Sequence, residues 1–87
     1  MYLILVYDIG VERVGKVCRT LRRRLTWVQN SVFEGEVSEA DFKKIQIDLS
    51  KIIDVSTDSV LCYCVDNPKG WEKRVMGRER ATTDTFL

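Results

Sequence analysis

The chain begins with a run of apolar residues that ends on a carboxylate, and this run limits the folds that the chain can adopt. Residues 2–8 predict a strand, and the unbroken apolar stretch 3–6 places such side chains on both of its faces. We therefore expect a central strand with a core on both sides. Asp8 closes the strand, and a carboxylate is costly to bury without a partner. Asp8 thus lies at a rim of the sheet, either as a site residue or as a turn former at the start of segment 8–10.

The next segment predicts a helix with one apolar and one basic face. The apolar stripe has helical spacing and consists of Val14, Val17, Cys18, Leu21 and Leu25. Six basic residues spread around the rest of the helix: Arg13, Lys16, Arg19, Arg22, Arg23 and Arg24. Solvated charges are the usual explanation of such a face. So many cations beside a single glutamate also favour contact with nucleic-acid phosphates, which arginine can bind in a bidentate way.

The rest of the chain alternates between strand and helix patterns. Residues 27–37 are rich in β-branched and aromatic side chains around a turn, which predicts two short strands. Ser38, with Asp41 three residues later, predicts the start of a second helix. The apolar stripe of that helix is Phe42, Ile45, Leu49, Ile52 and Ile53. Residues 60–65 predict another central strand.

The resulting order, β-α-β-β-α-β, is typical of an α+β ferredoxin-like fold, in which two helices cover one face of a sheet. The 87 residues suffice for one small domain. We predict the ferredoxin-like domain over residues 1–66 and a C-terminal tail over residues 67–87. Within the tail, residues 75–77 predict an extra C-terminal strand. That strand would be exchanged with the partner of a homodimer and would cover a sheet edge.

The absence of histidine narrows the possible chemistry. Without an imidazole there is no Ser-His or Cys-His mechanism, so any catalysis must use carboxylates, water, a hard metal ion or basic side chains. The three cysteines predict free thiols in a reducing cytoplasm. No apolar run approaches the ~18 residues that span a membrane, and the N-terminal segment lacks the features of a signal peptide.

Two further motifs suggest ligand binding but have simpler structural explanations. Segment 10–16 resembles a phosphate-binding loop, but Val17 stands where that loop needs a hydroxyl for magnesium. Cys62 and Cys64 share one face of a strand, and metal binding there would need two more ligands. We expect them to be small buried apolar residues.

A single carboxylate at Asp8 is compatible with a magnesium site. Magnesium often uses only one or two carboxylates and completes its shell with waters and substrate phosphates. The two-fold axis of a symmetric dimer would bring two copies of Asp8 together, and a divalent cation between them would offset their repulsion.

Several motifs at matching distances resemble the CRISPR-associated protein two family. They cover about residues 1–66 and are Tyr7-Asp8 at the strand end, Arg13 and Lys16 at the helix start, the run Val28-Gln29-Asn30-Ser31-Val32-Phe33-Glu34-Gly35, and Asp58-Ser59-Val60 before a strand that contains Tyr63. The resemblance implies the small homodimeric subunit of the spacer-acquisition machinery of antiviral defence.

The resemblance also implies an activity and its residues. Some members are metal-dependent endonucleases on single-stranded RNA or double-stranded DNA, with Mg²⁺ or Mn²⁺ held at the dimer interface by the position matching Asp8. Tyr7, Arg13, Lys16 and Phe33 match the other positions tied to activity. In this interpretation Arg13 and Lys16 hold flanking phosphates, Phe33 packs near the site and Tyr7 positions the backbone or a water.

Two alternatives to an enzyme follow from the same fold. The first is a non-catalytic scaffold of the integration complex. Such a dimer would bind DNA through Arg19, Arg22, Arg23 and Arg24 and dock the CRISPR integrase subunit through its tail. The second is an antitoxin-like or regulatory small dimer.

Overall fold

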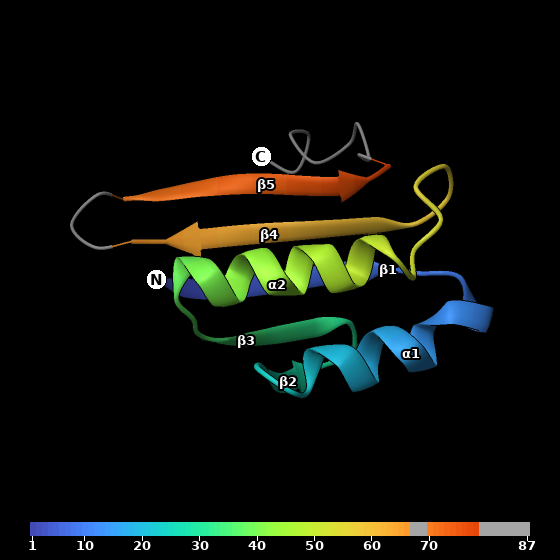
Figure 1. The fold of residues 1–87 in the computed structure, drawn as a ribbon, viewed down its shortest axis with the longest axis horizontal. Coiled ribbons are helices and arrows are strands. Elements are labelled where there is room, and N and C mark those ends of the chain that lie inside the picture. Colours follow the sequence, from blue (N-terminus) through green and yellow to red (C-terminus); the bar gives the residue numbers. More distant parts are fainter. Residues whose placement is uncertain (67–69, 79–87) are drawn as a thin grey trace.

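The elements follow one another in the predicted order and end with an extra strand (Figure 1). The computed structural model describes residues 1–66 and 70–78. The elements are β1 (Tyr2–Asp8), α1 (Val11–Leu21), β2 (Thr26–Gln29), β3 (Val32–Glu36), α2 (Glu39–Ser50), β4 (Ser59–Val65) and β5 (Trp71–Gly77). The strands form an antiparallel sheet in the order β2-β3-β1-β4-β5, with both helices against one face. The predicted α+β ferredoxin-like fold is confirmed.

β1 lies in the middle of this sheet, between β3 and β4. Its side chains alternate, so that Leu3, Leu5 and Tyr7 are buried on the helix side while Ile4 and Val6 are only partly buried. The single chain therefore does not supply the core that the sequence predicts on both sides of this strand. The reason is that both helices pack on the same face and leave the other without a second layer.

The uncovered face, which we call the open face, has a partly apolar surface. Ile4 and Val6 are opposite Tyr63 and Leu61 of β4 in the strand register, and all four are partly buried. Because cross-strand neighbours lie on the same side of a sheet, they form one continuous patch. Asp8, two residues beyond Val6, belongs to the same face.

The core lies between the sheet and the two helices. Its fully buried large side chains include Leu3, Leu5, Leu21, Phe33, Phe42, Ile45 and Leu49. Cys62 and Cys64 are also buried there, which confirms their prediction as small apolar residues. α2 begins where predicted, because the Ser38 hydroxyl accepts a hydrogen bond from the Asp41 backbone N–H at 3.0 Å. Neither helix among the described residues is long and apolar enough to cross a bilayer.

α1 ends earlier than its apolar stripe suggests. The helix stops at Leu21, and Leu25 reaches the core from the turn that follows, where its N–H donates to the Leu21 carbonyl at 2.8 Å. The prediction of a single helix carrying all six basic residues is therefore wrong for Arg22, Arg23 and Arg24. These three lie in the turn that leads into β2.

β5 joins the sheet beyond the predicted domain boundary at residue 66. It pairs with β4 of the same chain, from Val65 opposite Trp71 to Ser59 opposite Gly77. Gly77 has φ +75, and a Cβ there would collide with the Asp58 carbonyl oxygen, so the strand ends on a residue that only glycine suits. The predicted strand exchange with a partner chain stays a prediction, and tail residues 67–69 and 79–87 lie outside the described residues.

We predict that Phe33→Ala lowers the free energy of unfolding by about 3 to 5 kcal/mol, because the ring is fully buried at the centre of the core. Urea denaturation followed by circular dichroism measures the change. Val28→Ala, on the neighbouring exposed strand, is the control and should change stability by about 0.5 kcal/mol or less. Equal effects of the two substitutions would contradict the placement of Phe33.

Candidate active site

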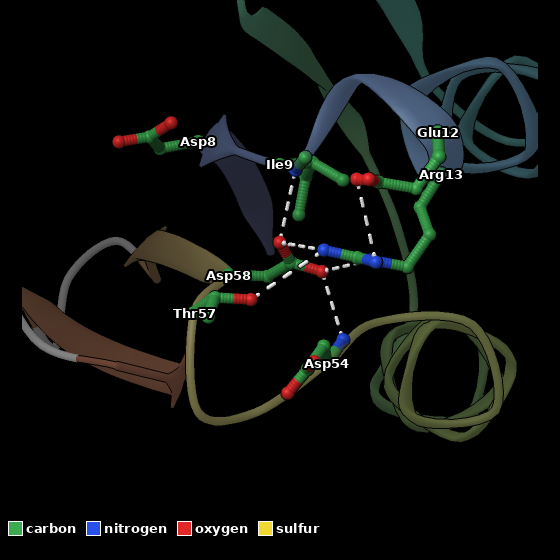
Figure 2. Close-up of a pocket in the computed structure, with 8 residues that line it drawn as sticks. Asp8, Ile9, Glu12, Arg13, Asp54, Thr57 and Asp58 are labelled. Atoms are coloured by element: carbon green, nitrogen blue, oxygen red, sulfur yellow. Dashed lines mark hydrogen bonds and ion pairs between the residues drawn. The ribbon is translucent and has the colours of Figure 1, made fainter.

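The end of β1 forms one wall of an open hollow at a rim of the sheet (Figure 2). The other walls are the loop into α1 and the loop between α2 and β4. The lining residues are Asp8, Ile9, Gly10, Glu12, Arg13, Asp54, Thr57 and Asp58. Asp8 and Arg13, which were predicted as site residues from the sequence, both line this hollow. The contribution of the loop between α2 and β4 was not predicted.

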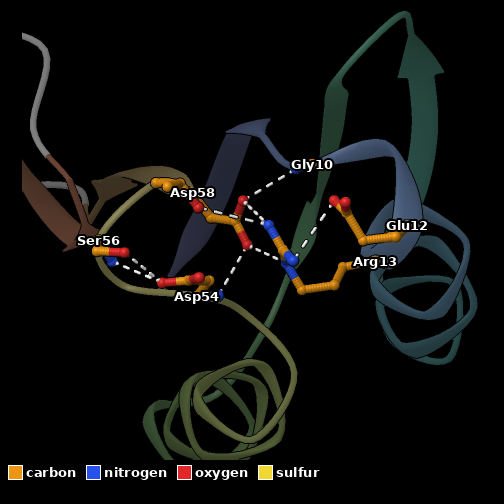
Figure 3. A network of polar contacts seen from close by, with 7 residues as sticks. Gly10, Glu12, Arg13, Asp54, Ser56 and Asp58 are labelled. Carbon is orange, nitrogen blue, oxygen red and sulfur yellow. Dashed lines mark hydrogen bonds and ion pairs between the residues drawn. The ribbon is translucent and has the colours of Figure 1, made fainter.

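Asp58 holds the two loops together (Figure 3). Its side chain is 1% exposed, and its carboxylate accepts hydrogen bonds from the backbone N–H groups of Gly10 (2.9 Å) and Asp54 (2.8 Å). The Arg13 guanidinium adds a bidentate pair, with Nε at 2.6 Å and Nη2 at 2.8 Å. These bonds satisfy both carboxylate oxygens, which makes the burial of this charge tolerable.

The same contacts set the protonation of the pair. The Arg13 guanidinium is the main cause that holds the pKa of Asp58 well below its usual range, with help from the two N–H donors and against the effect of burial. The pKa of Arg13 is raised in turn, chiefly by its hydrogen bonds to Asp58. Arg13 is therefore a structural cation of the rim in this chain. The sequence prediction that Arg13 holds a flanking phosphate stays a prediction, since only Nε and Nη2 of its guanidinium are bonded to Asp58.

The loop after α2 is also closed internally. The Asp54 carboxylate accepts hydrogen bonds from the backbone N–H (3.0 Å) and the hydroxyl (2.6 Å) of Ser56. These bonds lower the pKa of Asp54. The turn thus presents the N–H of Asp54 to Asp58 and fixes one side of the hollow.

Asp8 is placed differently from these residues. Its side chain points away from the Arg13–Asp58 pair, and it is exposed at the end of the rigid central strand (Figure 2). The alternation along β1 puts it on the open face. A carboxylate in this position is accessible to a metal ion, a substrate or a second protein chain.

Tyr7 and Phe33 do not line the hollow. Tyr7 faces the helices, where its hydroxyl lies 3.1 Å from Cys18 Sγ and its ring centroid 6.1 Å from that of Phe33. Burial, followed by the contact with Cys18, raises the pKa of Tyr7 to about 12, so it stays a neutral phenol. Both residues pack beneath the helices, and the structure does not bring them to the Asp8 side chain.

The remaining predicted phosphate ligands divide into two groups. Lys16, Arg19, Arg22 and Arg23 are exposed. Arg24 is turned toward α2, with its guanidinium 3.7 Å from the Asp48 carboxylate and 4.0 Å from that of Asp41. The first four are accessible to a polyanion, whereas Arg24 ties the turn to the second helix.

A divalent metal ion needs several oxygen ligands around it. Within residues 1–66 and 70–78, no three cysteine or carboxylate side chains gather into a metal-binding group. Of the carboxylates that line the hollow, Asp58 is buried, whereas Asp8 is exposed on the open face. One exposed carboxylate per chain fits a magnesium ion that takes further ligands from water and phosphate. It does not fit a site built by one chain alone.

The fold and the rim together define a class of protein: a small ferredoxin-like α+β domain whose central strand delivers an acid to an open sheet face. Residues 1–73 match the family model described as CRISPR associated protein Cas2. A protein named CRISPR-associated endoribonuclease Cas2, from Methanothermobacter thermautotrophicus, is 47% identical over 87 residues, which cover 100% of this chain and 96% of that one.

Other comparisons agree. A Pyrococcus furiosus protein of the same name is 60% identical over 63 residues, 72% of this chain and 74% of the relative. A crystal structure described as Cas2 superposes with a TM-score of 0.72 at 40% identity and covers 100% of this chain and 98% of that chain. The chain belongs to the Cas2 family of CRISPR-associated proteins.

The buried Asp58 carboxylate makes stability depend on pH. Because its folded pKa is lowered, its contribution is present above the unfolded value of about 3.9 and is lost as pH falls through the folded pKa. We predict that Asp58→Asn lowers unfolding free energy by about 2 to 3 kcal/mol at pH 7. In urea unfolding measured between pH 7 and pH 2, the difference from wild type should shrink only below about pH 4.

The matched control for this prediction is Asp48→Asn, which removes a partly exposed carboxylate near Arg24. It should cost about 1 kcal/mol or less. A pH-independent gap between wild type and Asp58→Asn would contradict the role assigned to the charged pair.

Proposed function

We propose that this protein is a metal-dependent endonuclease that hydrolyses phosphodiester bonds in RNA or DNA as a homodimer. The observation that carries this proposal is the position of Asp8, held by the central strand on the open face. The endoribonuclease names of relatives 47% and 60% identical to this chain support it. Its setting is the spacer-acquisition step of CRISPR antiviral defence, together with the integrase subunit. The free thiols Cys18, Cys62 and Cys64 suit a reducing cytoplasm.

The homodimer is proposed because one chain is incomplete in two ways. It leaves the apolar patch of Ile4, Val6, Leu61 and Tyr63 without a covering layer, and it offers one suitable carboxylate for a metal. A second copy against the open face would address both needs, since a two-fold axis pairs identical surfaces and identical Asp8 residues.

In the proposed hydrolysis, each side chain at the rim has a limited role. Mg²⁺ or Mn²⁺, when bound, would make a water molecule more acidic and offset the charge of the scissile phosphodiester. Asp8 would hold that ion. Lys16 is exposed on the first turns of α1 and would contact a flanking phosphate. Arg13 would act through its ion pair with Asp58, which fixes the two loops beside Asp8.

The scaffold remains a second candidate because of one observation. Lys16, Arg19, Arg22 and Arg23 are exposed, and the part of the chain that the structure describes contains no ion pair for Arg19, Arg22 or Arg23. A dimer with two such surfaces can bind DNA through phosphates with little sequence preference. Membership of the Cas2 family argues against the antitoxin-like alternative.

The substitution Asp8→Asn tests the nuclease, because it removes the negative charge and keeps the size of the side chain. We predict that magnesium-dependent cleavage of single-stranded RNA or double-stranded DNA falls at least about 100-fold, and that a chelator abolishes wild-type cleavage. Glu12→Gln, which neutralises an exposed carboxylate of the same hollow, is the control and should retain activity.

The same variant separates the two candidates. Undiminished cutting by Asp8→Asn would refute the metal role and indicate a contaminating nuclease. Spacer integration that is normal with Asp8→Asn but lost with Arg19→Ala and Arg22→Ala would favour the scaffold. Loss of integration with Asp8→Asn in a folded dimer would exclude a pure scaffold.

A further inference from the structure

We propose that Trp27 is a stacking platform for an unpaired base, so that this protein takes single-stranded nucleic acid across the edge of the sheet formed by β2. The inference rests on the proposed function and specifies its substrate class. Trp27 is 50% exposed, on an edge strand whose four residues are all exposed. About half of this large aromatic side chain is therefore left uncovered by folding and is accessible to a ligand.

The ring is held in one orientation. The indole Nε1 donates a hydrogen bond to the Asn30 carbonyl oxygen at 3.0 Å, across the turn between β2 and β3. Asn30 has φ +42, a left-handed conformation that asparagine tolerates better than most residues. The turn thus satisfies the polar edge of the indole within the protein. A ring fixed in advance loses less entropy when a base stacks on it.

Basic residues lie close to Trp27 along the chain. The turn that ends α1 carries Arg22 and Arg23, which are exposed and make no ion pair among residues 1–66 and 70–78. Arg23 and Trp27 are four positions apart along the chain, which limits the distance between their Cα atoms to at most about 14 Å. One strand of nucleic acid can therefore contact the arginines through its phosphates and the indole through a base. Aromatic rings beside cations are the usual composition of single-strand binding surfaces.

The position of Trp27 also connects it with the candidate active site. Trp27 lies opposite Phe33 in the strand register, so it is on the helix side of the sheet together with α1. The turn that holds its indole continues to Ser31, whose carbonyl accepts the Tyr7 N–H at 3.0 Å. Tyr7 precedes Asp8. Because Asp8 is on the open face, a strand stacked on Trp27 would reach the Asp8 rim by passing around this turn from the helix side.

The chain provides its own contrast at the opposite edge of the sheet. Trp71 on β5 is more exposed, at 69%, but it shares its surroundings with Glu39, Asp66 and Glu72. Its ring also packs against Tyr63 at a centroid distance of 6.3 Å. Because carboxylates repel a phosphate backbone, exposure of a tryptophan alone does not make a nucleic-acid site. Trp71 is therefore the matched control for Trp27.

The choice of a single strand follows from the chemistry of stacking. The bases of a duplex already stack on one another, whereas an unpaired base has a free face for an aromatic side chain. Loss of one such contact by alanine substitution weakens binding by roughly 5- to 150-fold. Contacts to a duplex through phosphates would not depend on the indole.

The test measures binding in a chelator, so that cleavage plays no part. The probes are a fluorescently labelled 12-nucleotide oligoadenylate RNA and a blunt DNA duplex of mixed sequence, followed by anisotropy. We expect Trp27→Ala to weaken RNA binding about 5- to 150-fold and duplex binding less than about twofold. Trp27→Phe should restore most of the RNA affinity, and Trp71→Ala should leave it within about twofold of wild type.

A second measurement, of tryptophan fluorescence, keeps Trp27 in place and so does not require the Trp27→Ala variant to fold. In Trp71→Phe protein, the sole indole is Trp27, and its fluorescence should be quenched on addition of the RNA and not of the duplex. The proposal is overturned if Trp27→Ala weakens both probes equally or neither, if Trp71→Ala has the larger effect, or if the RNA leaves the fluorescence of Trp27 unchanged. Trp27-dependent binding without any cleavage by the wild type would contradict the nuclease and leave this inference standing.

Discussion

The arrangement of the rim depends on one buried carboxylate. Asp58 accepts the backbone N–H of Gly10, the backbone N–H of Asp54 and the guanidinium of Arg13, and so joins two loops that are more than 40 residues apart in the sequence. Its own carbonyl accepts the Arg78 N–H at the end of β5. Such a residue fixes the frame from which Asp8 projects without touching a substrate itself. The frame depends on the charge of Asp58, because a neutral side chain would leave Arg13 in the rim without its partner.

The sheet has two faces that serve different purposes. The helix side holds the core, with Phe33 and Tyr7 packed against each other, and at its β2 edge lies the basic turn with Trp27. The open face holds a partly apolar patch and Asp8. Successive side chains of β1 point to opposite faces of the sheet. Tyr7 and Asp8 therefore belong to different faces although they are neighbours in the chain. Tyr7 and Asp8, which the family resemblance assigns to one catalytic set, are thus separated by the pleat of the strand.

The sequence predicted the fold well, because the element order is expressed in local patterns. Apolar runs, a helical stripe and the Ser38 cap are each visible within a few residues, and the β-α-β-β-α-β order follows from them. The site was harder to predict. The ion pair of Arg13 could not be predicted, because its partner Asp58 is 45 residues away and the pairing exists only in the folded chain. Arg22 to Arg24 looked helical because Leu25 continues the apolar stripe, although it reaches the core from a turn. Asp58 appeared in the sequence as part of the Asp58-Ser59-Val60 motif of the family resemblance, and as an acid directly before a buried strand, but neither feature shows what it binds.

In the proposed homodimer, Asp8 is one half of a symmetric pair that holds a single metal ion. Native mass spectrometry of the protein with Mn²⁺ tests it directly, since it counts chains and ions in the same particle. We expect the wild-type particle to contain two chains and one tightly held ion. The Asp8→Asn particle should contain two chains and no ion. A metal ion bound to each single chain, or a dimer whose ion is unaffected by Asp8→Asn, would contradict it.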